Sequence, residues 1–194
     1  VRYLTNHSTG KMGYAIAREA VLRGAEVTLI SGPVSLKPVD GAKMVPVTTA
    51  QDMFEAVQKA LPETDILIMS AAVADYRPAT VAEDKIKKNE GDMSIPLERT
   101  PEILTWVSQN RHSGLFVCGF SMETRDMLEN SQRKLQKKHL DMIVANNLKT
   151  QGAGFGVDTN VVTVITPEST NELPLMGKDR VAQKLLDAIL AARE

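Results

Sequence analysis

Small residues and lysines follow one unbroken apolar run in this sequence. The run, residues 66–70 (ILIMS), leads into the small-residue stretch 71–76 (AAVADY), and Lys85, Lys87 and Lys88 follow about ten residues later. Backbone amides in a tight small-residue turn, together with nearby ammonium groups, suit an anionic ligand such as a phosphate. A solvated loop is the alternative for the lysines alone, but their place after the strand favours a site for an anionic, phosphate-carrying substrate.

A second segment with anion-binding chemistry lies near the start of the chain, at residues 6–13 (NHSTGKMG). Ser8 or Thr9 is predicted to cap a helix that runs to Gly24, and the first turn of such a helix offers free amides and a positive dipole end. The spacing matches neither a Walker loop nor a dinucleotide fingerprint. On these residues alone, an ordinary helix cap explains the segment equally well.

Basic residues also gather on the predicted helix 125–138. Lys134 and Lys138 are four residues apart and therefore share one face of that helix. Such a face can meet phosphates or simply face the solvent, and spacing by itself favours the solvent.

The elements that must position these residues alternate between strand and helix patterns. Apolar runs at 26–31, 66–70, 115–120 and 140–145 alternate with helical spacing at 50–61, 101–107, 125–138 and 179–193. A run such as 66–70, without polar alternation, is typical of a strand covered on both faces, and we expect it in the middle of a parallel sheet. The pattern predicts an α/β fold, a Rossmann-like three-layer sandwich with a mainly parallel sheet and a small strand and flap extension.

Composition limits the classes of function. The net charge is −1 and only 4% of the 194 residues are aromatic, which counts against nucleic-acid binding. Cys118 is the single cysteine and lies in an apolar run, so we expect a buried hydrophobe in a reducing, cytoplasmic environment. We expect no membrane span, because no apolar run approaches about 20 residues.

Taken together, six segments resemble the phosphopantothenate-cysteine ligases of coenzyme A biosynthesis. They occur in family order at residues 5–13, 27–33, 71–76, 85–88, 119–124 and 145–147. The resemblance implies one ligase domain over residues 1–194, with a flap at about 77–97 and a late strand extension at about 150–176. It also implies that the family's first strand precedes the asparagine motif and lies before Val1.

The resemblance implies a two-step reaction. CTP, with Mg²⁺ on its triphosphate, activates the carboxylate of 4'-phosphopantothenate as an acyl-cytidylate, and the amine of cysteine then displaces CMP. Both steps build negative charge on oxygen, so fixed donors and cations are the expected catalytic groups.

The resemblance also assigns residues. Asn6 and Lys85 are implied to be catalytic, Asn6 at the acyl-cytidylate carbonyl and Lys85 on the flap. Ser8, Gly10 and Ala72 are implied to bind phosphate or substrate. The implied nucleotide contacts are Met69, Ser70, Ala71, Asp75, Lys85, Pro101, Glu102, Ile103, Leu104, Phe120, Lys134 and Lys138. The resemblance thus implies that Lys134 and Lys138 face the nucleotide and not the solvent. Glu102 occupies a position where the family commonly has Asp.

The resemblance further implies a homodimer, with residues 77–97 and the late strands as candidate contacts, and a longer protein in which a flavin-dependent decarboxylase is fused to the ligase. The alternative is a nucleotide- or NAD-binding module on a similar sheet. It would need a GxGxxG turn and an acidic residue after the second strand, and this sequence shows neither.

Overall fold

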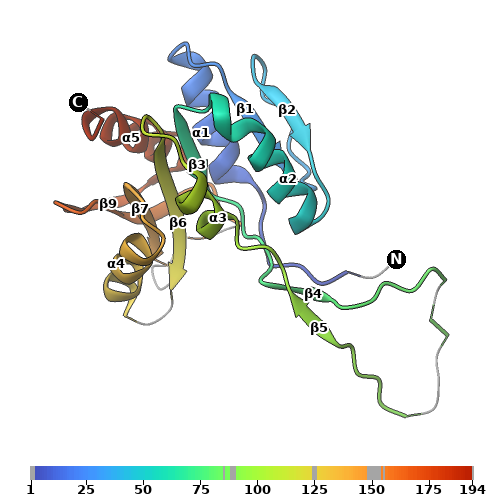
Figure 1. Ribbon diagram of the computed structural model, residues 1–194. Coiled ribbons are helices and arrows are strands. Elements are labelled where there is room, and N and C mark those ends of the chain that lie inside the picture. Colours follow the sequence, from blue (N-terminus) through green and yellow to red (C-terminus); the bar gives the residue numbers. More distant parts are fainter. Residues whose placement is uncertain are drawn as a thin grey trace.

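Five strands form the main sheet, in the order β3–β6–β7–β8–β9 (Figure 1). The computed structural model describes residues 3–84, 86–87, 91–123, 126–147, 154 and 156–193. The helices are α1 (Lys11–Leu22), α2 (Ala50–Ala60), the 3-10 turn η1 (Leu61–Glu63), α3 (Ile103–Asn110), α4 (Met127–Lys137) and α5 (Lys178–Ala191). The strands are β1 (Thr28–Ser31), β2 (Lys43–Pro46), β3 (Ile66–Met69), β4 (Tyr76–Pro78), β5 (Leu97–Arg99), β6 (Phe116–Glu123), β7 (Met142–Asn147), β8 (Thr159–Ile165) and β9 (Thr170–Gly177).

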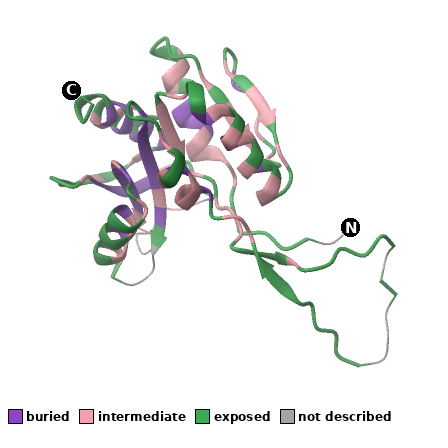
Figure 2. Cartoon of the chain, viewed as in Figure 1, coloured by how far each residue is buried: buried purple, intermediate pink, exposed green. Residues whose placement is uncertain are grey.

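Side-chain alternation along β7 explains the layers. Met142 and Val144 belong to an apolar cluster shared with α1 and α5, whereas Ile143 and Ala145 belong to a second cluster shared with α2, α3 and α4. Successive side chains of a strand point to opposite faces, so each face of the sheet is covered by its own helices. The predicted three-layer α/β sandwich is confirmed, and the buried strands form its centre (Figure 2).

The expectation that residues 66–70 occupy the middle of the sheet is wrong. β3 pairs in parallel with β6 and forms one edge of the five-stranded sheet, while β1 and β2 pair with each other in a separate two-stranded sheet. The prediction that both faces of this strand are covered is confirmed, because Ile66 and Ile68 pack on one apolar cluster and Leu67 and Met69 pack on the other. An apolar run indicates that both faces of a strand are covered. It does not indicate whether the strand has a hydrogen-bonded neighbour on each side, because that depends on backbone pairing.

The late strands are part of the main sheet. β8 pairs antiparallel with β7, and six of its seven residues are buried, so the predicted extension at about 150–176 holds one integral strand and one exposed edge strand, β9. Residues 150–153 and 155 of that range lie outside the described residues.

The start of α1 differs from the prediction. Gly10, not Ser8 or Thr9, occupies the capping position, with φ 75° and no side-chain cap. A Cβ at Gly10 would lie 2.9 Å from a methyl carbon of Val34, so both the left-handed backbone and the close approach of that side chain require glycine there.

The described residues between β4 and β5, 79–84, 86–87 and 91–96, form an arm that extends away from the body (Figure 1). β4 and β5 form its base as a short antiparallel ladder. The edge strand expected at 93–97 lies instead at Leu97–Arg99, and the assignment of about 77–97 as a flap stays a prediction. Within the part of the chain described, no helix is long and apolar enough to cross a membrane.

Candidate functional site at the carboxyl edge of the sheet

The carboxyl end of β3 lies beside the middle of β6, because Met69, the last residue of β3, pairs with Gly119, and β6 continues to Glu123. In open α/β sheets, ligands bind outside this edge. The turn that follows β3 therefore lies near the second half of β6, residues 119–123, which the sequence also singled out.

Asn6 is held at the turn that follows β3. Its side-chain amide donates a 3.2 Å hydrogen bond to the carbonyl oxygen of Val73. The first turn of α1 approaches the same turn, since a Cβ at Gly13 would lie 2.9 Å from the hydroxyl of Ser70. Ser8 accepts a long hydrogen bond, 3.4 Å, from the amide of Gly10. Two segments more than fifty residues apart are thus brought together.

Asp75 and Asn6 line one surface hollow of about 280 Å³. Its walls come from the start of the chain and the base of the arm: Leu4, Thr5, Asn6, Ala74, Asp75, Tyr76 and Leu97. Thr100 fixes this turn, because its hydroxyl donates to the carbonyl oxygen of Ala74 at 2.6 Å and its amide donates to that of Asp75 at 3.0 Å. The hollow combines an amide and a carboxylate with apolar walls, and Ala72 lies in the same turn.

Lys134 and Lys138 point inward, toward β6 and α3. The Lys134 amine donates to the carbonyl oxygen of Phe120 at 2.9 Å, and the Lys138 amine pairs with the carboxylate of Glu102 and donates to the Thr105 hydroxyl at 2.6 Å. The solvent-facing alternative for this helix face is therefore wrong. Tertiary contacts, which the four-residue spacing does not encode, decided the orientation.

The predicted segment 101–104 joins the same group. Pro101 and Glu102 precede α3, Ile103 is buried at its first position, and a Cβ at Gly119 would lie 3.5 Å from a methyl carbon of Leu104. A hydrogen bond from the Lys138 amine lowers the pKa of the Glu102 carboxyl, burial opposes this with a smaller effect, and the Thr105 hydroxyl adds a still smaller lowering. The carboxylate is thus held ionised at neutral pH.

A basic hollow of about 330 Å³ lies along α4 beside this group. It is lined by Asn130, Arg133, Lys134, Lys137 and Lys138. Four cationic side chains around one concave surface suit a polyanion such as a polyphosphate.

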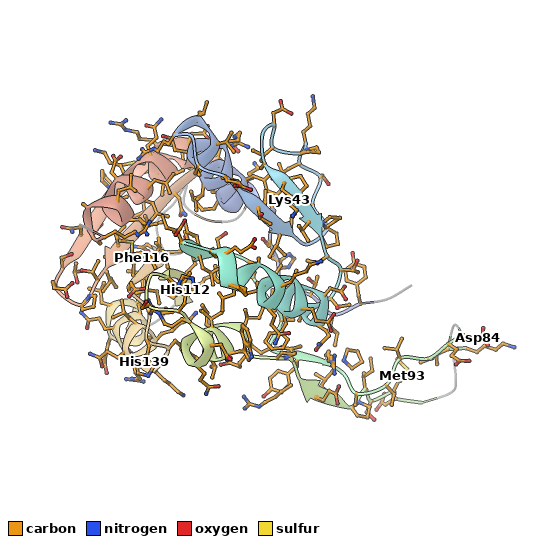
Figure 3. The ribbon with its side chains drawn as sticks, turned by 45° about the horizontal axis from the view of Figure 1, so that its top comes forward. Lys43, Asp84, Met93, His112, Phe116 and His139 are labelled. Atoms are coloured by element: carbon orange, nitrogen blue, oxygen red, sulfur yellow. The ribbon has the colours of Figure 1, made fainter. Side chains whose placement is uncertain are left out.

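Lys85 lies outside the described residues, so its predicted catalytic role stays a prediction. Its neighbour Asp84 and the later Met93 both lie on the arm, well away from the body (Figure 3). Lys87, also on the arm, is exposed.

A buried polar chain that the sequence did not reveal crosses the same edge. The hydroxyls of Ser131 and Ser121 are 2.7 Å apart, Asn146 donates to the carbonyl oxygen of Ser121, and Asn160 donates to the side chain of Asn146 at 2.8 Å. Such a chain of hydrogen bonds joins α4, β6, β7 and β8. Only the pairing register brings the four residues together.

Known proteins share this architecture and sequence. The family model for the DNA/pantothenate metabolism flavoprotein C-terminal domain matches residues 1–192. The chain belongs to this family. The coenzyme A biosynthesis bifunctional protein CoaBC of Bacillus subtilis is 48% identical over 193 residues, which are 98% of this chain and 47% of that protein. The chain thus spans about half the length of the curated relatives it matches.

Solved structures superpose closely on this chain. The crystal structure of the C-terminal domain of a CoaBC protein has a TM-score of 0.82 and 40% identity, covering 97% of this chain and 85% of that one. A Cab2 variant in complex with phosphopantothenate-cysteine shares the fold at a TM-score of 0.79 and 14% identity, covering 99% of this chain and 81% of that one.

Proposed function

We propose that this domain ligates 4'-phosphopantothenate to cysteine in coenzyme A biosynthesis, using CTP through an acyl-cytidylate intermediate. The observation that carries the proposal is the convergence of Asn6, the turn after β3 and the α3–α4 lysine group at one sheet edge. Family membership supports it, because the similar proteins act in coenzyme A biosynthesis by name.

Asn6 is proposed to stabilise the reacting acyl group. Attack of the substrate carboxylate on the α-phosphate of CTP forms the acyl-cytidylate and releases pyrophosphate. Attack of the cysteine amine then places negative charge on the carbonyl oxygen before CMP leaves and the amide forms. A neutral amide donor such as that of Asn6, fixed by Val73, suits this oxyanion without neutralising the carboxylate beforehand.

The nucleotide is proposed to lie across β3 and β6. Backbone groups of residues 69–71 and the carboxylate of Asp75 would contact it from one side, and residues 101–104 with Phe120 from the other. Lys134 and Lys138 already have protein acceptors, the carbonyl oxygen of Phe120 and the carboxylate of Glu102. We therefore propose that they hold the walls of the nucleotide pocket and supply positive potential to it.

Mg²⁺ is proposed to arrive with the triphosphate. It commonly binds through substrate phosphates and only one or two carboxylates. That mode fits the described residues, among which no three His, Cys, Asp or Glu side chains gather as a metal-binding group. Asp75 would be a carboxylate close to the nucleotide.

A homodimer is proposed from the arm. Val81, Ile86, Met93 and Ile95 each expose half or more of their surface on it, which is costly unless a partner covers them. The arm also carries the segment that includes Lys85, and a second copy would let this segment act at a neighbouring site. In a longer protein the domain is proposed to be fused to a flavin-dependent decarboxylase and to work in the cytoplasm.

The first experiment measures pyrophosphate release from CTP, with and without 4'-phosphopantothenate and cysteine. We expect release that requires 4'-phosphopantothenate, with the amide product appearing only when cysteine is added. No release with CTP or ATP, from this chain and from a version extended at its amino terminus, would refute the ligase assignment.

A variant pair tests the role of Asn6. Asn6→Ala should lower ligation by about a hundredfold or more, as expected for loss of an oxyanion donor. Asn110→Ala is the matched control, because that exposed amide also donates to a backbone carbonyl, of Trp106, but on α3 away from the hollow. Equal losses in the two variants would contradict the assignment.

A further inference from the structure

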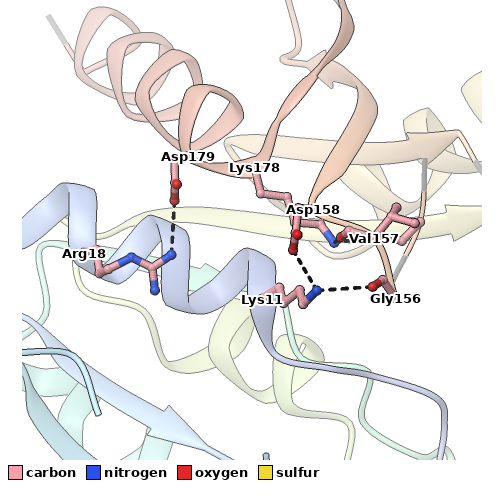
Figure 4. Close-up of polar contacts among 8 residues, drawn as sticks. Lys11, Arg18, Gly156, Val157, Asp158, Lys178 and Asp179 are labelled. Carbon is pink, nitrogen blue, oxygen red and sulfur yellow. Dashed lines mark hydrogen bonds and ion pairs between the residues drawn. The ribbon is translucent and has the colours of Figure 1, made fainter. Parts of the chain in front are cut away.

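Two lysines at the beginnings of different helices converge on one segment (Figure 4). Lys11, the first residue of α1, donates to the carbonyl oxygen of Gly156 at 3.2 Å and pairs with the carboxylate of Asp158 at 2.7 Å. Lys178, the first residue of α5, donates to the carbonyl oxygens of Gly154 and Val157. We call the described part of this segment, residues 154 and 156–158, the clamped segment.

The two lysines hold the segment in different ways. Lys178 is only 6% exposed, its amine is bonded to backbone carbonyls, and its own amide donates to the carbonyl oxygen of Asp158 at 2.8 Å. These contacts attach the clamped segment to the start of α5. The Lys11–Asp158 pair is different, because the Asp158 side chain is 89% exposed. Exposed ion pairs contribute little to stability and exchange partners readily.

Lys11 lies where an anionic partner is favourable. A positive charge at the start of a helix opposes the helix dipole, so Lys11 gains from an anionic neighbour there. The Lys11 amine lowers the pKa of the Asp158 carboxyl by a hydrogen bond and by charge, which keeps the carboxylate ionised. Lys11 follows Gly10 directly, and the first turn of α1 lies against Ser70 at the end of β3.

We propose that Lys11 is a phosphate-binding residue of the site, and that Asp158 occupies its amine until a phosphate of a substrate replaces the carboxylate. Lys178 keeps the clamped segment in place during this exchange, so only the exposed pair changes. The inference rests on the proposed function, which brings phosphate groups to this edge. Two sources supply that chemistry, the triphosphate of CTP and the phosphate of 4'-phosphopantothenate.

The sign of one substitution tests the proposal. Asp158→Asn removes the competing charge and should lower the dissociation constant of the phosphate-bearing ligand by about threefold to tenfold, as expected for one nearby unit charge in water-exposed surroundings. Titration calorimetry would compare CTP with cytidine, and 4'-phosphopantothenate with pantothenate. The affinity for cytidine and for pantothenate, which carry no phosphate, should not change. The phosphate-bearing ligand whose dissociation constant falls identifies which substrate supplies the phosphate that Lys11 binds.

A neighbouring ion pair supplies the matched control. Arg18 of α1 pairs with Asp179 of α5 at 3.1 Å, and the Asp179 side chain is 80% exposed (Figure 4). Asp179→Asn removes a carboxylate of similar exposure, bound to the same helix, and should leave all affinities unchanged. Lys11→Met should weaken phosphate binding, and in its presence Asp158→Asn should have no further effect.

Inorganic tripolyphosphate separates this proposal from the ligase proposal. Tighter tripolyphosphate binding by Asp158→Asn, lost with Lys11→Met, supports the exchange even if no ligation is detected. Normal ligation with unchanged or weaker binding of every phosphate ligand by a folded Asp158→Asn variant overturns the exchange and leaves the ligase proposal intact. Thermal melting of each variant establishes that it is folded.

Discussion

Ile143 and Ile95 are the same residue type in opposite environments. Ile143, in β7, is fully buried between the sheet and its helices, whereas Ile95, on the arm, exposes 51% of its surface. The body buries apolar groups and fixes the strand ends, and the arm leaves its apolar groups available. The comparison indicates that stability resides in the body, whereas the apolar side chains of the arm contribute little to it.

The largest expected effect lies in the arm and spares stability. Lys85→Gln should retain the fold but reduce ligation by about a hundredfold or more, because a cation near developing charge contributes to the transition state and little to folding. Ligation assays and thermal melting on the same preparation check this. A melting temperature that falls together with activity would place Lys85 in the structural framework instead.

The reverse effect is expected in the body. Ile143→Ala should lower the free energy of unfolding by about 2–5 kcal/mol through lost burial and a residual cavity. Ile95→Ala, the matched change on the arm, should cost less than about 0.5 kcal/mol in the monomer. Urea denaturation of both variants measures the difference, and similar losses would remove the distinction between the two regions.

Association is the next expectation for the arm. Ile95→Lys should raise the dissociation constant of the proposed homodimer by about tenfold or more, since a buried interface residue commonly contributes at least that factor. Leu22→Lys, at the exposed end of α1, is the control and should not change it. Sedimentation velocity over a concentration series gives both values. A monomeric parent chain at high concentration would contradict the dimer.

The smallest effect concerns the Glu102–Lys138 pair. The lowered pKa of Glu102 means that the pair stabilises the fold above the ordinary glutamate value of 4.5, and that this contribution disappears as the pH falls through the lowered value. Glu102→Gln should therefore cost less than about 1 kcal/mol at pH 7, since more than half of the side chain is exposed. The difference from the parent chain should vanish at strongly acidic pH. Denaturation at several pH values checks this, and a cost independent of pH would exclude the ion pair as its cause.

Several features of the fold were predictable from local pattern. Apolar periodicity located the helices and buried strands, and both faces of residues 66–69 are covered as their composition predicts. Cys118 is buried, and burial raises the pKa of its thiol, in agreement with its apolar neighbours. These features depend on which side chains avoid water, and the residues themselves carry that information.

The tertiary structure alone decided how distant groups meet. Local pattern and spacing did not show that β3 lies at a sheet edge, that Lys134 and Lys138 turn inward, or that Ser131, Ser121, Asn146 and Asn160 form one chain of hydrogen bonds. Nor did it show that Asp158 faces Lys11, 147 positions away. Strand pairing and hydrogen bonds between distant residues depend on register and crossover geometry, which local periodicity does not specify.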